Sequence, residues 1–273
     1  TATEYDTAEY KLAALTTTCD NVLTYGAIPK SDGGEFGADG DYKVCVDLYD
    51  NAGNHTYDNS PTIALETTVP AFTSIAWANS ATDGYINLAE NTASTDLVDT
   101  LVGTGYTIAE YVLKATGTTC DGALTYGALS KSDDAGFGAD GDYKVCVKLS
   151  DAAGNPPAYG STSSDVTLDK TVPAFTSLAW ANSATDNYIN DAEHSASTDL
   201  VDSLVASGQD TTEYSLESSA TTCAAAASWE TLPKSDSSDF GSDGDYKVCV
   251  ALSDDAGNPV AYGGTASDVT LDT

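Results

Sequence analysis

The chain has 273 residues and a strongly unbalanced charge, because ten lysines and no arginine accompany 42 acidic residues, for a net charge of −32. Such a surface repels phosphate backbones and anionic lipid headgroups, so the composition argues against nucleic acid and membranes as partners. No apolar stretch is long enough to cross a bilayer, so no membrane span is predicted in this segment.

The sequence repeats itself with a period of about 100 residues. The segment around Trp77 returns around Trp180, and Gly-Asp-Tyr-Lys-Val-Cys-Val occurs three times. This period suits one β-sandwich domain and is too long for one solenoid turn. We therefore expect a partial repeat at 1–67, which lacks its first strands, and complete repeats at 68–170 and 171–273.

The predicted elements of the reference repeat, 68–170, are short segments rich in β-branched and aromatic residues, and turn residues separate them. Asp83-Gly84 and the glycine-rich segment 136–141 mark turns, and no segment has a convincing helical period. Strands are expected, in chain order, at 71–78, 97–101, 109–115, 124–129, 142–150 and 166–168. The pattern predicts an all-β fold of tandem immunoglobulin-like antiparallel β-sandwich domains.

The clearest strand is 142–150, which alternates strictly between apolar and polar residues. Its apolar side defines the expected core face, with Tyr143, Val145, Val147 and Leu149. Its other side carries Lys144, Cys146 and Lys148, so the cysteine is expected to point away from the core.

The six cysteines form three pairs with the same separation of 26 positions, and no C-x-x-C motif occurs. This pattern predicts one disulfide per repeat rather than a metal site. Each bond would stabilise its repeat by at most about 3.5 kcal/mol in the loop-entropy model and indicates a compartment outside the reducing cytosol. The expected pairs are Cys19–Cys45, Cys120–Cys146 and Cys223–Cys249.

Two motifs resemble the bacterial immunoglobulin-like repeats of giant surface adhesins. One is Asp-Ala-Ala-Gly-Asn at 151–155, which precedes a strand and Leu-Asp-Lys-Thr-Val-Pro; the other is Asp-Gly-Tyr-Ile-Asn-Leu-Ala-Glu at 83–90. Related segments recur at 50–54, 186–193 and 254–258, so the resemblance covers the whole chain. It implies an extracellular or cell-surface stalk that holds a terminal binding domain away from the cell, often with calcium at domain junctions.

One spacing departs from antibody-type domains, in which a tyrosine precedes a core cysteine by two residues. Here Tyr143 precedes Cys146 by three residues, which turns the cysteine outward. We expect Tyr143 to bond back to nearby backbone as a corner residue. The disulfide is then expected to fix the Cys120 loop to the exterior of the sheet.

The resemblance makes Ca²⁺ the expected cofactor, and this ion takes six to eight oxygen ligands. We expect three segments to meet at each junction: the Asp-x-Ala-Gly-Asn loop, the linker acid, and the Asp-x-x-x-Asn-x-x-Glu segment of the next repeat. The expected ligands are Asp50, Glu66, Asp83, Asn87 and Glu90 at the first junction, and Asp151, Asp169, Asp186, Asn190 and Glu193 at the second. The alternative is turn chemistry, in which Asp and Asn bond their own backbone. The Asp-Gly-Asp segments at 39–41, 140–142 and 243–245 admit the same two interpretations.

No catalytic motif is present, and His55 and His194 occupy non-equivalent positions, so the chain is not expected to be an enzyme. The leading hypothesis is a structural extender of an adhesin or extracellular filament, whose partners are the neighbouring repeats. The alternative is a module that binds carbohydrate or a host surface, for which Trp77, Trp180 and Trp229 are candidates, although packing roles are favoured.

The partial repeat leaves two alternatives open for its missing strands. They lie upstream in the same chain, or a neighbouring subunit of a fibre supplies them by strand addition. The first alternative is favoured, because the chain ends in register with the end of a repeat and has no spare strand to donate.

Overall fold

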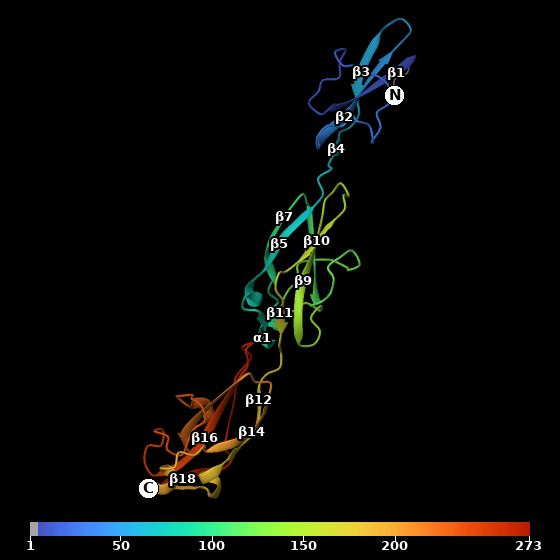
Figure 1. Ribbon diagram of the computed structural model, residues 1–273. Coiled ribbons are helices and arrows are strands. Elements are labelled where there is room, and N and C mark those ends of the chain that lie inside the picture. The colour runs from blue at the N-terminus through green and yellow to red at the C-terminus, as the bar shows by residue number, and fades with distance from the viewer. Residues whose placement is uncertain (1–4) are drawn as a thin grey trace. The chain divides into compact units, whose positions relative to one another are not determined.

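The computed structural model describes residues 5–273 (Figure 1). We call residues 1–67, 68–170 and 171–273 repeats 1, 2 and 3, and this division remains a prediction from the sequence period. Contacts group the chain into two compact units, and the boundary between them crosses repeat 2. The first unit comprises the described residues up to Thr73, Gly103–Ala109 and Lys148–Tyr159; the second comprises Ser74–Val102, Glu110–Val147 and Gly160–Thr273.

Repeat 3 lies within the second unit and consists of two sheets. The smaller sheet pairs β12 (Ala174–Trp180) with β14 (Val201–Ser207) in antiparallel orientation. The larger sheet has the strand order β13-β18-β16-β15, and β17 also pairs with β16. Its strands are β13 (Tyr188–Asn190), β15 (Thr211–Ser218), β16 (Gly244–Ser253), β17 (Ala261–Gly264) and β18 (Val269–Asp272).

Side chains from both sheets of repeat 3 form one hydrophobic core. Leu178 and Val201 from the smaller sheet belong to the same buried cluster as Val248, Val250 and Leu252 from β16. The two sheets therefore pack face to face as a sandwich, in which alternate residues of each strand point inward.

The strands of repeat 2 follow the same plan, whereas repeat 1 corresponds to the larger sheet alone. From residue 5 onward, repeat 1 has one sheet, in which β2 pairs with the three other strands. Its strands are β1 (Thr7–Ala14), β2 (Gly40–Tyr49), β3 (His55–Asn59) and β4 (Ile63–Leu65). Those of repeat 2 are β5 (Ala71–Trp77), β6 (Tyr85–Ile86), β7 (Val98–Thr104), β8 (Ile108–Ala115), β9 (Gly141–Ser150), β10 (Ala158–Ser161) and β11 (Val166–Leu168).

The core face predicted for strand 142–150 is confirmed. Val145, Val147 and Leu149 have no exposed surface, and Tyr143 is 7% exposed. Cys146 lies on the other side of the strand and is also fully buried, since its disulfide draws the preceding loop over it.

The predicted fold class, tandem immunoglobulin-like β-sandwich domains with one disulfide each, is confirmed by these sheets and by the three cysteine pairs. One pairing in each complete repeat is parallel, however: β6 with β11 and β13 with β18. The short strands β6 and β13 form the edge of the larger sheet in their repeats, beside β11 and β18.

Short helices were missed by the sequence analysis. They are α1 (Leu88–Ala93), α2 (Asp191–His194), and the 3₁₀ helices η1 (Asn79–Asp83), η2 (Asn182–Asp186) and η3 (Cys223–Ala225). Six residues or fewer are too short to show a helical period, and α1 and α2 depend instead on their caps.

The expected strand at 124–129 is wrong. This segment belongs to the loop that Cys120 ties to β9, and its sheet contact is a single bridge between Tyr111 and Gly127. The strand β10 (Ala158–Ser161) was not expected, because its small residues carry little β signal.

Each repeat contains the predicted tyrosine corner. The hydroxyl of Tyr143 donates to the Ala139 carbonyl (2.7 Å) and accepts from the Gly138 amide (2.9 Å). Tyr42 and Tyr246 make the same pair of bonds in their repeats. These bonds fix the turn that precedes the central strand.

Candidate functional site

The same three elements follow one another in every repeat: an Asp-Gly-Asp turn, a ten-residue strand, and an Asp-x-Ala-Gly-Asn loop. The strands are β2, β9 and β16, each of 10 residues. A strand of this length separates its turn from its loop by about 33 Å. Each turn contacts the segment that leaves its repeat, and the loops of repeats 2 and 3 contact the linkers that enter them.

The turn holds the linker that leaves its own repeat. Asp39 accepts bonds from the hydroxyl and amide of Thr67 (2.6 and 2.9 Å) and from those of Thr68 (2.7 and 3.1 Å). The hydroxyls of Thr67 and Thr68 contribute most to lowering the pKa of Asp39 to about 2. These donors stabilise the ionised carboxylate.

The other two repeats make the same contact, which we call the turn contact. Asp140 accepts from the Thr171 hydroxyl (2.7 Å), and Asp243 accepts from the hydroxyl and amide of Thr273 (3.1 and 3.2 Å). The second aspartate of the turn has another role, since Asp142 accepts from Thr167 of β11 (2.7 Å). Both aspartates of the turn therefore bind threonines from the C-terminal part of the repeat or the linker.

The loop at the other end of the strand is organised by its aspartate. Asp151 accepts from the amides of Gly154 (2.8 Å) and Asn155 (3.1 Å) and from the Asn155 side chain (2.9 Å). These bonds lower the pKa of Asp151, and the Asn155 side chain is the largest cause. Gly154 has a φ of +84°, which explains the glycine of the motif.

The asparagine of the loop also holds the linker that enters its repeat. The Asn155 side-chain amide donates to the Glu66 carbonyl (3.1 Å), and that of Asn258 donates to the Asp169 carbonyl (2.9 Å). We call this the loop contact. Each of the two linkers is thus bound by the turn before it and by the loop after it.

In the second compact unit the loop of repeat 3 also contacts repeat 2. The Leu88 amide, at the start of α1, donates to the side-chain oxygen of Asn258 (2.9 Å). The Asn87 side chain donates to the Ala256 carbonyl (3.2 Å). Asn258 is only 4% exposed.

The two Asp-x-x-x-Asn-x-x-Glu segments form helix caps. Asn87 and Glu90 make a capping box at α1, and Asn190 and Glu193 make the equivalent box at α2. Their first aspartates bond locally, since Asp83 accepts from the Tyr85 amide at 3.0 Å. Asp186 accepts from the Tyr188 amide at the same distance.

The segments brought together differ from those expected at the second junction. The loop beside Asp169 is 254–258, which follows the linker, and not 151–155. The helix cap that contacts this loop is that of repeat 2, at Asn87. Asn190 instead lies opposite Asp272 in the β13–β18 pairing, at the C-terminal end of repeat 3.

Two expected ligands of the first junction, Asp50 and Glu66, belong to the first compact unit and make separate contacts. Asp50 bonds to its own loop, through Ala52 and Asn54, and Asn54 contributes most to lowering its pKa. Glu66 contributes its backbone carbonyl to the loop contact with Asn155. Across residues 5–273, no three Asp, Glu, His or Cys side chains are arranged to hold a metal ion. The calcium ligands expected at the two junctions therefore stay a prediction.

The tryptophans considered as a sugar platform are held by internal contacts. The indole N–H groups of Trp77 and Trp180 each donate at 2.9 Å, to the carbonyls of Ser164 and Ser267. Trp229 packs against Tyr262, with ring centroids 5.7 Å apart. These contacts match the packing roles that the sequence favoured.

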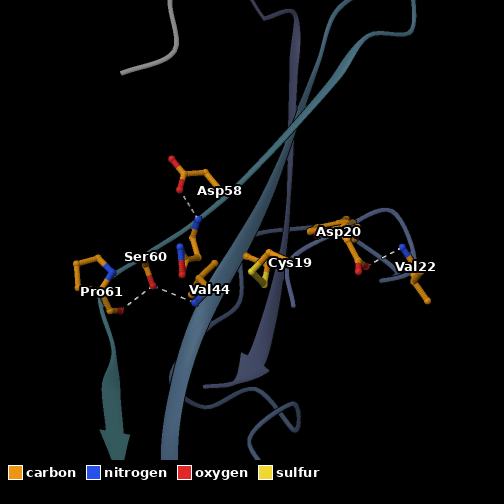
Figure 2. The surroundings of a disulfide bond; sticks show 10 residues. Cys19, Asp20, Val22, Val44, Asp58, Ser60 and Pro61 are labelled. Atoms are coloured by element: carbon orange, nitrogen blue, oxygen red, sulfur yellow. Dashed lines mark hydrogen bonds between the residues drawn. A yellow bond between two sulfur atoms is a disulfide. The ribbon is translucent and has the colours of Figure 1, made fainter. Parts of the chain in front are cut away.

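The three predicted disulfides are present, and each ties a loop to the central strand of its repeat. Figure 2 shows Cys19 in its loop beside β2. The loop turns at Asp20, whose carboxylate accepts from the Val22 amide (3.0 Å), and on the other side Val44 of β2 donates to Ser60 (2.9 Å). The disulfide therefore fixes a loop to the sheet exterior, as predicted from the outward cysteine.

No protein-family model and no curated protein matches this chain. Among solved structures, the chain is similar to a Ca²⁺-stabilised adhesin that helps an Antarctic bacterium reach out and bind ice. The two are 25% identical over 99% of this chain and 66% of that chain, with a TM-score of 0.36. A tetra-tandem repeat from the extending region of a large adhesion protein is 15% identical over 97% and 66%, with a TM-score of 0.34. Protocadherin gammaB7 EC3-6 is 12% identical over 97% and 68%, with a TM-score of 0.34. The chain thus spans about two thirds of the length of each.

Within residues 5–273, the helices are too short and too polar to traverse a lipid bilayer.

Proposed function

We propose that the chain is a structural extender of an extracellular or cell-surface adhesion protein or filament. The observation that carries this proposal is the placement of the turn contact and the loop contact at opposite ends of one strand. In repeat 3 the entering linker meets Asn258 after β16, and the outgoing Thr273 meets Asp243 before β16. Entry and exit are therefore separated by the length of this strand.

This arrangement makes each repeat a spacer. A ten-residue strand contributes about 33 Å between the two linker contacts, and further repeats of the same design would each add a similar length. The disulfides support this role, because they stabilise small domains and persist in oxidising compartments outside the cytosol. The net charge of −32 favours solubility of such a stalk and disfavours its collapse onto itself.

Small-angle scattering on the chain with one additional copy of 171–273 tests this function. Relative to the original chain, we expect the maximum dimension to increase by about 33 Å or more, because linkers fixed at both ends cannot fold back. A control replaces the linker segment 169–171 between repeats 2 and 3 with a glycine-serine segment of equal length, and its mean dimension should fall. An added repeat that leaves the maximum dimension unchanged would contradict the extender function.

A further inference from the structure

We propose that Asn258 locks the joint between repeats 2 and 3 through hydrogen bonds within the protein, without a bound metal ion. This inference rests on the proposed extender function and concerns how its linker is kept stiff. All the residues involved belong to the second compact unit.

Asn258 joins three segments with one side chain. Its amide nitrogen donates to the Asp169 carbonyl of the linker (2.9 Å) and to the Asp254 carboxylate of its own loop (3.0 Å). Its oxygen accepts from the Leu88 amide at the start of α1 (2.9 Å). Both donor hydrogens and one acceptor site are therefore used, at a residue that is 4% exposed.

The Leu88 amide is one of the donors that the first turn of a helix leaves without an intrahelical partner. The side-chain oxygen of Asn258, in the next repeat, supplies that partner. In the opposite direction, the Asn87 side chain donates to the Ala256 carbonyl (3.2 Å). The helix end of repeat 2 and the loop of repeat 3 thus satisfy each other's polar groups. Separation of the repeats would expose these groups again.

The carboxylates that a calcium ion would need already accept bonds from the chain. Asp254 accepts from the amide of Asn258 (2.9 Å) and, with its other oxygen, from the Asn258 side chain (3.0 Å). Glu90 accepts from the Asn87 amide (3.0 Å), and Asp169 accepts from the Thr171 amide (2.9 Å). A hard cation with six to eight oxygen ligands would have to share these oxygens with the chain's own donors or displace those donors.

The substitution Asn258→Asp separates the two explanations. Aspartate has nearly the same shape, but it has no side-chain N–H to donate, and it places a negative charge beside Asp254. A protein-only joint is weakened by this change, whereas a calcium site would gain a hard anionic ligand. Asn54→Asp is the matched control, because Asn54 bonds to Asp50 in the same way but contacts no linker carbonyl among residues 5–273.

Amide hydrogen exchange of Leu88 in the full chain provides the measurement, with Ca²⁺ and with excess EDTA. In the unsubstituted chain we expect equal protection in the two buffers. Asn258→Asp should accelerate exchange about tenfold in both buffers, as the loss of bonds worth about 1.4 kcal/mol would do, and Asn54→Asp should leave the rate unchanged. Exchange at Val250 in β16 reports whether the variant repeat is still folded.

The proposal would be overturned if the Leu88 amide of the unsubstituted chain exchanged faster in EDTA than in Ca²⁺. It would also be overturned if Ca²⁺ slowed Leu88 exchange more in Asn258→Asp than in the unsubstituted chain. These failures differ from failure of the extender function. A chain whose added repeat does not lengthen it contradicts the extender, whatever the effect of chelation. A chain whose joint is stiff only with calcium is consistent with the extender function but contradicts the metal-free joint.

Discussion

Asp39 binds the linker through four hydrogen bonds, and its ionisation therefore reports linker attachment. Its pKa in the folded chain is about 2, against an ordinary value of 3.8. A folded pKa below the unfolded one means that the ionised group favours the folded contact. The contribution is complete above about pH 4 and is lost as the pH falls through about 2.

An NMR titration of Asp39, followed through the Thr67 amide, tests this contact. We expect a midpoint near pH 2, and Asp39→Asn should abolish the transition, because an amide does not ionise in this range. Asp41→Asn, in the same turn, is the control and should leave the transition in place. A midpoint close to 3.8 would show that the threonines do not hold the carboxylate.

The roles of single residues were partly predictable. The Asp-x-Ala-Gly-Asn motif predicts calcium ligands, with turn chemistry as the alternative, and Asp151 and Asn155 bond within their loop. The same Asn155 also binds the Glu66 carbonyl, 89 positions earlier in the chain. Every residue has a backbone carbonyl, so the sequence does not indicate which carbonyl is the partner of Asn155.

At the scale of elements, the strands with strict alternation were the most predictable. The strand Asp142–Ser150 was expected almost as it is found, because a half-buried strand must alternate between apolar and polar residues. The helix α1 depends on two capping residues, Asn87 and Glu90, and gives no periodic signal. The sequence did contain the capping pattern, Asn-x-x-Glu, but it was interpreted as a set of metal ligands.

The order of segments at the junction follows from the pairing of the last strand of the repeat. β9 pairs antiparallel with β11, and Leu168 lies opposite Gly141, so the chain leaves the repeat beside the turn that precedes β9. The loop after β9 must then lie at the other end of the strand. This places it beside the entering linker and not the outgoing one.

Removal of one disulfide tests how far the repeats are stabilised separately. We expect Cys223→Ala with Cys249→Ala to lower the free energy of unfolding of repeat 3 by up to about 3.5 kcal/mol, because the unfolded loop is released. Amide exchange in β16 measures this loss. Exchange in β9 of repeat 2, which keeps its own disulfide, is the internal control and should not change. An equal loss of protection in both strands would show that the repeats do not unfold separately.

For the whole molecule, the repeated order of turn, strand and loop matters more than any pocket. Asp39, Asp140 and Asp243 each bind threonine at the C-terminal end of their repeat or directly after it. Asn155 and Asn258 each bind the linker that enters a repeat. The sequence period predicted the units, and the strand between the two contacts explains how such a unit adds length.

The central claim is that the linkers are held from both sides, and backbone order parameters of the linker amides test it most directly. The amides of Thr68 and Thr171 follow the bound carbonyls of Glu66 and Asp169. The Thr68 amide donates to Asp39 in the turn contact, whereas the Thr171 amide donates to Asp169 and the Thr171 hydroxyl makes the turn contact with Asp140. NMR relaxation should give them values near 0.85, like those of rigid strands, in the presence of EDTA. Values below about 0.6, typical of flexible segments, would contradict the account.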